Sequence, residues 1–125
     1  MIRDLLSAGK RVCLPRLEGG EMLSAPYSKE RVKNSYGIEE PLSSGDEPCE
    51  VVFAPLLAAD GDGYRLGYGG GYYDRYFARR PSALRVGLCY EAQIARSLPR
   101  EAGDMPLHAV ITEAGIRRFP QEADG

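Results

Sequence analysis

The residues best suited to chemistry stand together in the segment RLGYGGGYYDRYFAR at 65–79. Four glycines fall within positions 67–71, with Arg65 before them and Asp74 after them. Glycine reaches left-handed backbone angles and has no Cβ, so the N–H groups of such a loop can converge on an anion. A helix beginning near Gly71 adds its positive end. The spacing therefore indicates a phosphate-binding loop, with Arg65 as a forked contact and Asp74 as a carboxylate for Mg²⁺.

These residues also have a purely structural interpretation. Glycine clusters serve as turns, an aspartate in a first helical turn favours the helix dipole, and aromatic residues such as Phe77 pack in cores.

Two known phosphate-binding patterns do not fit. G-x-G-x-x-G fails because the pattern from Gly67 ends on Tyr72, and the P-loop pattern fails because Arg11 follows the Gly9–Lys10 pair. Composition and spacing reach no further than an anion-binding loop.

Strands and helices alternate around this loop. Continuous apolar runs predict buried strands at 51–58, 83–90 and 107–115. Helices are predicted at 2–9, 71–80 and 91–98. A hairpin of 11–17 with 21–27, a surface loop at 28–50 and a flexible tail at 117–125 complete the chain. This order predicts an α/β fold in three layers, a central, largely parallel sheet with helices on both faces, whose ligands bind at the carboxyl ends of strands.

Length and composition narrow the class of protein. A chain of 125 residues fits a single domain over 1–125. The formal net charge of −2 argues against a nucleic-acid or anionic-membrane partner. No apolar run approaches the ~20 residues of a membrane helix. Three cysteines without a C-x-x-C pair, and one histidine, do not favour a zinc site. Neutral free thiols in the reducing cytoplasm are expected instead.

The segment GYRLGYGGGYYDRYFAR at 63–79 resembles the 5-formyltetrahydrofolate cyclo-ligase family, also called methenyltetrahydrofolate synthetases. Four flanking segments agree with it: YGIEEP at 36–41, VVFAPLLAAD at 51–60, RVGLCYEAQ at 85–93 and DMPLHAVITEAG at 104–115. The resemblance implies an α/β fold and the ATP- and Mg²⁺-dependent conversion of 5-formyltetrahydrofolate to 5,10-methenyltetrahydrofolate, with release of ADP and phosphate. It also implies small-molecule substrates. A cytoplasmic location and a monomer are expected as well.

The resemblance assigns roles to individual positions, while the composition alone leaves the catalytic residue unknown. The ATP site it implies consists of Arg65, Leu66, Gly67, Tyr68, Gly69, Gly70, Gly71, Tyr72 and Tyr73. The folate would contact Tyr68, Gly69, Gly70, Gly71, Tyr72 and, through its pterin, Tyr36. Asp74 would help to hold Mg²⁺, with His108 as a weaker candidate.

Two departures from the family pattern keep alternatives open. Family members are usually longer at the amino end, where basic residues and a glutamate contribute to the site, so we expect this chain to be N-terminally shortened and weakly active or inactive. His108 stands where members often have a metal-binding aspartate, although Mg²⁺ prefers oxygen, and a satisfied polar residue is the structural interpretation. The alternatives are a nucleotide- or folate-binding protein of the same fold and a different α/β enzyme acting on a phosphorylated molecule.

Overall fold

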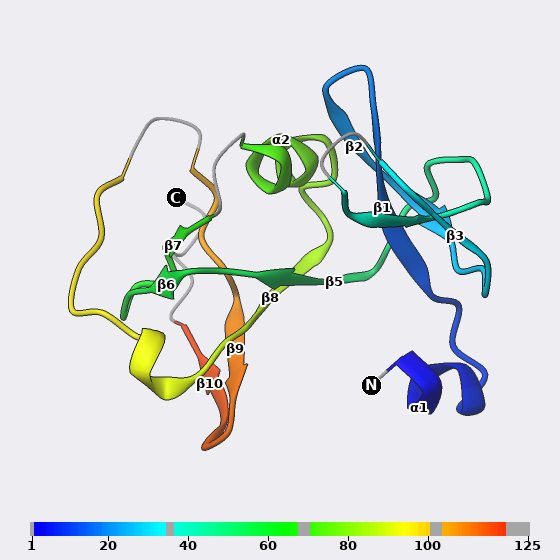
Figure 1. Cartoon of the computed structure of the whole chain (residues 1–125). Coiled ribbons are helices and arrows are strands. Elements are labelled where there is room, and N and C mark those ends of the chain that lie inside the picture. Colours follow the sequence, from blue (N-terminus) through cyan, green and yellow to red (C-terminus); the bar gives the residue numbers. More distant parts are fainter. Residues whose placement is uncertain (1, 35–36, 68–70, 101–103, 120–125) are drawn as a thin grey trace. The chain divides into compact units, whose positions relative to one another are not determined.

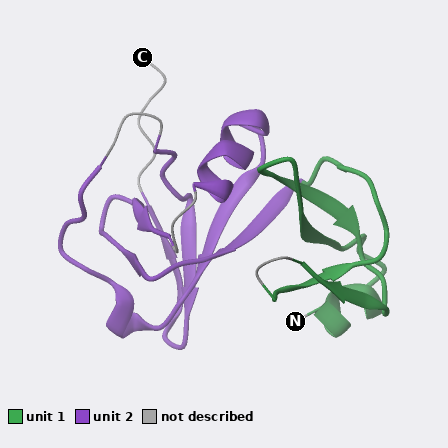
Figure 2. Cartoon of the chain, turned by 45° about the horizontal axis from the view of Figure 1, so that its top comes forward, with its two compact units in different colours: residues 1–49 green, residues 50–125 purple. Residues whose placement is uncertain are grey.

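A computed structural model describes residues 2–34, 37–67, 71–100 and 104–119 (Figure 1). The chain divides into two compact units, residues 1–49 and 50–125, each described by itself (Figure 2). The single domain predicted over 1–125 stays a prediction. Within the described residues, no helix combines the length and the apolar character needed to cross a membrane.

The first unit holds one short helix and two antiparallel hairpins. Helix α1 (Ile2–Ser7) ends as predicted at Gly9, which has a φ of 77°. The N–H groups of Gly9 and Lys10 donate to the carbonyls of Leu6 and Leu5, both at 3.0 Å, which is the Schellman arrangement. Strands β1 (Cys13–Glu18) and β2 (Glu21–Pro26) form the predicted hairpin.

The surface loop predicted at 28–50 is wrong in part. Strands β3 (Arg31–Lys33) and β4 (Glu39–Pro41) pair antiparallel within it. The buried carboxylate of Glu40 holds this hairpin, because it accepts the Leu17 N–H at 2.7 Å and the Asn34 side-chain amide at 2.9 Å. Strands of three residues, with Val32 the one branched apolar residue among them, are too short to show apolar alternation in the sequence, so the pattern favoured a loop.

The second unit is built on a four-stranded sheet in the order β10-β9-β8-β5. Strands β5 (Val51–Pro55), β8 (Leu84–Leu88) and β9 (Ala109–Thr112) are parallel, and β10 (Gly115–Arg118) runs antiparallel to β9. Helix α2 (Tyr72–Arg79) lies on the connection from β5 to β8 (Figure 1). The ribbon of β6 (Ala58–Ala59) and β7 (Arg65–Leu66) precedes α2. The predicted α/β fold with a largely parallel central sheet is confirmed.

The flexible tail predicted at 117–125 is wrong in part, because its first residues belong to a strand and to the core of this unit. Phe119 is buried with Leu56, Ala59, Leu107 and Val110, and the backbone N–H of Phe119 donates to the His108 carbonyl at 2.9 Å. Residues 117–119 are therefore strand and core, because β10 returns along β9 and carries Phe119 back over the sheet. Residues 120–125 lie outside the described part of the chain.

Two further predictions are corrected here. The strand predicted at 51–58 is divided into β5 and β6, and it is not buried on both faces, since Val51 is exposed. The helix predicted at 91–98 is reduced to one 3₁₀ turn, η1 (Glu91–Gln93). The chain leaves that turn to pair with β6, where the Ala95 N–H donates to the Ala59 carbonyl at 2.7 Å. The tertiary hydrogen bond replaces the helical one.

Candidate functional site

A buried carboxylate shapes the turn that leads to the glycine loop. Asp60 is 1% exposed, and its Oδ1 accepts the N–H groups of Asp62 and Tyr64 at 2.9 and 3.1 Å. Gly63 completes the turn with a φ of 91°, and a Cβ there would lie 2.6 Å from the Leu107 carbonyl oxygen. The turn thereby fixes where β7 begins, and β7 begins with Arg65.

Helix α2 starts where the sequence predicted a helix. Gly71 is its N-cap with a φ of 65°, a left-handed angle that glycine adopts without strain. The buried rings of Tyr76 and Phe77 attach the helix to the unit, so the predicted core position of Phe77 is confirmed. The same packing places Tyr73 and Asp74 in the first turn, next to β7.

The structure brings Arg65 and Asp74 together, as the phosphate-and-metal hypothesis requires. Arg65 Nη1 lies 3.9 Å from Asp74 Oδ1, and the guanidinium carbon lies 5.2 Å from the centre of the Tyr73 ring. Arg65 Nη2 donates to the Pro55 carbonyl at 3.4 Å, while Arg65 Nε is buried without a hydrogen-bond partner. With 6% of its side chain exposed, Arg65 is a buried cation whose donors are largely unused.

Gly67 makes room for this guanidinium. A Cβ at Gly67 would lie 3.0 Å from Arg65 Nη2 and 3.1 Å from Nη1. A side chain at position 67 would therefore require the Arg65 guanidinium, the end of a flexible side chain, to shift by a few tenths of an ångström. Gly67 has this steric role in addition to any contact of its backbone with a ligand.

Burial dominates the electrostatics of the pair. Burial lowers the pKa of Arg65, although Asp74 opposes the shift. Burial also raises the pKa of Asp74, and the neighbouring Asp104 raises it further, whereas Arg65 and the Met105 N–H stabilise the carboxylate. Burial likewise raises the pKa of Tyr73. Both charges are thus held in surroundings that compensate them incompletely.

Asp104 lies close enough to the Arg65–Asp74 pair to affect both side chains, and the sequence did not point to it. Its charge acts on both Arg65 and Asp74, although about 30 positions or more separate it from either in the sequence. Its only signal was an acidic residue just before the last parallel strand. Sequence spacing cannot show that this strand's entry lies beside α2.

The structure describes only some of the other predicted site residues. Leu66 is exposed, and Tyr72 lies under the Arg75 guanidinium, at 5.0 Å. Neither position confirms or contradicts a ligand contact. Tyr36, Tyr68, Gly69 and Gly70 lie outside the described residues.

His108 is held by the backbone rather than by the Asp74 group. His108 Nδ1 accepts the Arg85 N–H at 2.9 Å, and the His108 N–H donates to the Arg85 carbonyl at 2.8 Å. Burial and the Arg85 charge lower the pKa of His108, so the neutral ring is favoured. Within the described ranges, no three His, Cys, Asp or Glu side chains form a group able to hold a metal. The His108 metal role stays a prediction, and its position fits the structural interpretation.

The thiols are free among the described residues, as expected. Burial and the neighbouring Cys49 raise the pKa of Cys13 to about 11. Burial and the carboxylates of Glu91 and Glu113 raise that of Cys89. The thiol forms of Cys13 and Cys89 are therefore strongly favoured at neutral pH.

A pocket of about 560 Å³ opens at the carboxyl ends of the parallel strands. We call it the strand-end pocket. It is lined by Pro55, Leu56, Leu88, Cys89, Tyr90, Gln93 and Ile111. In open α/β sheets this end is where ligands bind. The sequence analysis did not single these residues out, because their separate apolar runs read only as strands.

The second unit is an α/β fold in which a buried arginine and an aspartate lie together at the glycine loop. Residues 1–113 match the model of the 5-formyltetrahydrofolate cyclo-ligase family. The chain is 37% identical over 132 residues to the 5-formyltetrahydrofolate cyclo-ligase of Escherichia coli K12, covering 93% of this chain and 70% of that protein. It is also 37% identical over 130 residues to the Haemophilus influenzae cyclo-ligase, covering 89% and 66%.

A solved structure agrees with these relatives. The NMR structure of Aquifex aeolicus 5,10-methenyltetrahydrofolate synthetase superposes with a TM-score of 0.79 at 32% identity, covering 99% of this chain and 66% of that one. The chain belongs to the 5-formyltetrahydrofolate cyclo-ligase family, a family of ligases in folate one-carbon metabolism. The family resemblance carried by residues 63–79 and the four flanking segments is confirmed.

Proposed function

We propose that this protein converts 5-formyltetrahydrofolate to 5,10-methenyltetrahydrofolate with ATP and Mg²⁺, releasing ADP and phosphate. The observation that carries the proposal is the buried, incompletely hydrogen-bonded guanidinium of Arg65 beside Asp74, at the start of the glycine loop of a cyclo-ligase family member. A buried cation of this kind gains most from a ligand that supplies negative charge and several acceptors.

The chemical step proposed for this site is a phosphoryl transfer followed by ring closure. The formyl oxygen takes the γ-phosphoryl group as its bond to ADP breaks. N10 of the folate then attacks the formyl carbon and loses its proton, and the oxygen leaves as phosphate. Such a reaction depends mainly on positioning and charge neutralisation. Arg65 would orient the phosphoryl oxygens through its free N–H groups, and the Gly67–Gly71 segment would let the triphosphate approach the backbone.

The carboxylates present fit a magnesium ion that is shared with phosphates. Mg²⁺ is usually held by one or two carboxylates together with substrate oxygens, and Asp74 with Asp104 supplies two interacting carboxylates. Asp74 would hold the ion and Asp104 would support it. When bound, the ion neutralises charge on the phosphates. His108 adds no oxygen ligand to this set, and Nδ1 of its ring already accepts the Arg85 N–H.

Turnover tests the proposal directly. The chain is mixed with 5-formyltetrahydrofolate, ATP and Mg²⁺, and the methenyl product is followed by its absorbance. Product formation that requires both ATP and Mg²⁺, and that is lost in Asp74→Asn, is expected to be slow in this chain and faster in a longer version extended in frame. Absence of ATP-dependent product from the chain and from a longer, in-frame version of it would contradict the proposal.

A second candidate is a nucleotide- or folate-binding protein of the same fold without turnover. The placement of His108 favours it, because this ring is engaged with the Arg85 backbone and contributes no oxygen ligand. Calorimetry separates the two candidates: binding of ATP or folate without product identifies the binding protein. A cytoplasmic monomer acting on small molecules remains part of the proposal.

A further inference from the structure

The turn at 60–64 is held by hydrogen bonds from two other parts of the chain. The buried Asp60 carboxylate accepts the Leu98 N–H at 3.2 Å, in addition to two N–H groups of the turn itself. The Leu107 N–H donates to the Gly63 carbonyl at 2.7 Å. The turn is thus a fixed support, from which the chain continues directly to Arg65 at the start of β7.

Arg100 contacts three residues of this turn. Arg100 Nη2 lies 2.5 Å from Asp62 Oδ2 and 3.6 Å from Asp60 Oδ2. The guanidinium carbon lies 4.0 Å from the centre of the Tyr64 ring. A planar guanidinium can pair with carboxylates along its edge while its face stacks on an aromatic ring, which the point charge of a lysine cannot do. We call these four residues the Arg100 clamp.

The Arg100 clamp holds one end of the segment that carries Asp104. Arg100 is attached to the turn before Asp104, and Leu107 is attached to it after Asp104. Between these two attachments, the charge of Asp104 acts on Asp74, and the Met105 N–H donates to the Asp74 carboxylate. The position of Asp104 and Met105 beside Asp74 therefore depends on both attachments, and Arg100 supplies one of them.

The fold itself depends little on Arg100. Asp60 keeps three backbone N–H donors when the guanidinium is removed, so its buried carboxylate retains hydrogen bonds. The side chains of Arg100 and Asp62 are 43% and 71% exposed, and ion pairs at such exposure contribute little to stability. Loss of Arg100 should therefore displace the segment that carries Asp104 without unfolding the unit.

We infer that Arg100 is a positioning residue for the binding of ATP with Mg²⁺. It holds Asp104 and Met105 against Asp74, so that two carboxylates are directed at the ion in place of one. The inference rests on the proposed function, since it assumes that Asp74 and Asp104 receive Mg²⁺ together with the phosphates of ATP.

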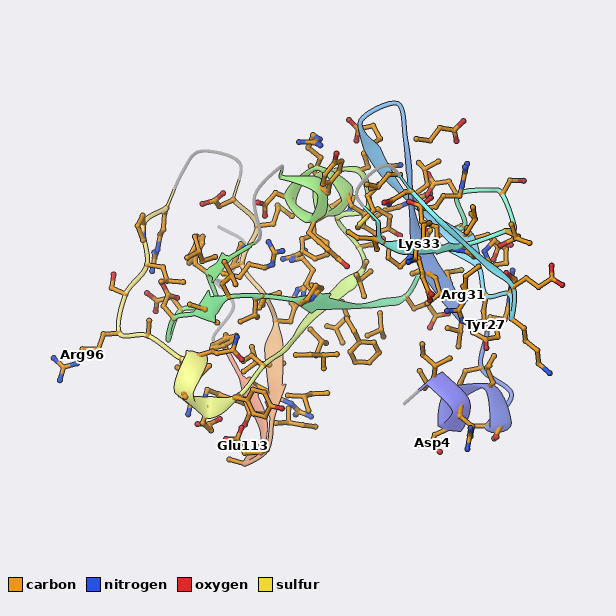
Figure 3. All side chains as sticks on the ribbon, viewed as in Figure 1. Asp4, Tyr27, Arg31, Lys33, Arg96 and Glu113 are labelled. Atoms are coloured by element: carbon orange, nitrogen blue, oxygen red, sulfur yellow. The ribbon has the colours of Figure 1, made fainter. Side chains whose placement is uncertain are left out.

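Replacing Arg100 by glutamine tests this role by calorimetry with ATP, with and without Mg²⁺. We expect Arg100→Gln to weaken ATP with Mg²⁺ roughly tenfold, as loss of a residue that orients metal ligands does, and to leave metal-free ATP nearly unchanged. Arg100→Lys keeps the charge beside Asp62 but loses the stacking on Tyr64, so it should restore part of the affinity. The matched control is Arg96→Gln, which should change neither measurement, because the exposed Arg96 side chain points away from the ribbon (Figure 3).

Hydrogen exchange without any ligand gives a second readout. The Met105 amide proton is bonded to Asp74, so NMR should find its exchange several-fold faster in Arg100→Gln and unchanged in Arg96→Gln. The amides of β8 and β9 should keep their exchange rates, because the sheet does not depend on the clamp. Should Arg100→Gln fail to fold, Asp62→Asn removes the closest carboxylate of the clamp from an exposed position, and both measurements apply to it.

A double variant shows whether Arg100 acts through Asp104. Asp104→Asn alone should weaken ATP with Mg²⁺, and adding Arg100→Gln should weaken it little further, since residues that act through one another are not additive. Additive losses would show that Arg100 acts elsewhere and would overturn the inference.

The other outcomes separate the inference from the proposed function. Unchanged affinity for ATP with Mg²⁺ in Arg100→Gln overturns the inference. Faster exchange throughout β8 and β9 also overturns it, because Arg100 would then be a structural residue. Weaker binding in Arg100→Gln, with no methenyl product from the wild type or from its longer version, supports the inference and overturns the proposed function alone. A chain that binds no ATP overturns both.

Discussion

Replacing Arg65 by methionine would distinguish a ligand-binding cation from a structural one. The side chain is 6% exposed, with one carboxylate oxygen at 3.9 Å and one carbonyl at 3.4 Å. Removing a guanidinium from water costs several kcal/mol. Its attraction to a carboxylate at this distance is on the order of 4 kcal/mol at an effective dielectric constant of about 20. The two effects nearly cancel, and Asp74, with 33% of its side chain exposed, can be hydrated when its partner is removed. Arg65→Met should therefore change the free energy of unfolding by less than about 1 kcal/mol.

The effect on ATP should be much larger. Hydrogen bonds to charged groups contribute about 1.5–3 kcal/mol each, so losing one such contact weakens ATP binding about 10- to 150-fold. Arg65→Lys keeps the charge but loses the planar fork, and its ATP affinity should lie between those of the wild type and Arg65→Met.

Two measurements on the same samples decide this prediction. Urea denaturation without ligand gives the free energy of unfolding, and calorimetry with Mg²⁺ and ATP gives the affinity. A large loss of stability in Arg65→Met, about 3 kcal/mol or more, with unchanged ATP affinity would refute the reasoning. Arg65 would then be a structural partner of Asp74 and Tyr73.

The remaining predictions concern four other positions. Gly67→Ala should weaken ATP binding only by a small factor in calorimetry, because the new Cβ would lie 3.0 Å from Arg65 Nη2, the flexible end of a side chain that can shift by a few tenths of an ångström. Asp74→Asn should abolish the Mg²⁺ dependence of ATP binding in calorimetry. Burial raises the pKa of Asp74 above 3.8, so the folded wild type binds more protons than the unfolded chain and loses stability as the pH rises from 3.8 through the folded pKa. Urea titrations should find this slope removed in the variant. The pKa of His108 is lowered from 6.5, so stability should fall as the pH drops below 6.5 and level off below the folded value, and His108→Gln should flatten that part of the profile. Phe119→Ala should lower the free energy of unfolding by about 3 kcal/mol in urea. A loss near zero would show that Phe119 belongs to a flexible tail and not to the core.

The elements with strong local signals were predicted correctly from the sequence. Aromatic residues one turn apart after a glycine defined α2, and branched apolar runs defined β8 and β9. β10 was missed because its burial pattern is exposed throughout, so its pairing with β9 leaves no apolar periodicity. Phe119 looked like part of a polar tail for the same reason. Only the three-dimensional course of the chain returns it to the core.

The candidate site, too, could be predicted from the sequence only in part. Arg65 and Asp74 lie nine positions apart on either side of a glycine loop, and the sequence was sufficient to assign both to one site. It could not reveal that the guanidinium is buried against Tyr73, because that depends on how β7 and α2 pack. Asp104 and the strand-end pocket were beyond reach as well, since they depend on the order of the strands in the sheet.

The charges of the site suggest that the nucleotide and the metal enter together. Arg65 is a buried cation whose Nε has no acceptor, and the pKa of Asp74 is raised by burial and by Asp104. A bare triphosphate would satisfy Arg65 but would repel both carboxylates, whereas a free Mg²⁺ would satisfy the carboxylates but would repel Arg65. The complex of Mg²⁺ with ATP satisfies both at once, since it presents phosphate oxygens to one and a cation to the other. Binding of ATP should therefore strengthen when Mg²⁺ is present and should release a proton from Asp74 at acidic pH, and calorimetry in buffers of different ionisation enthalpy would measure that proton.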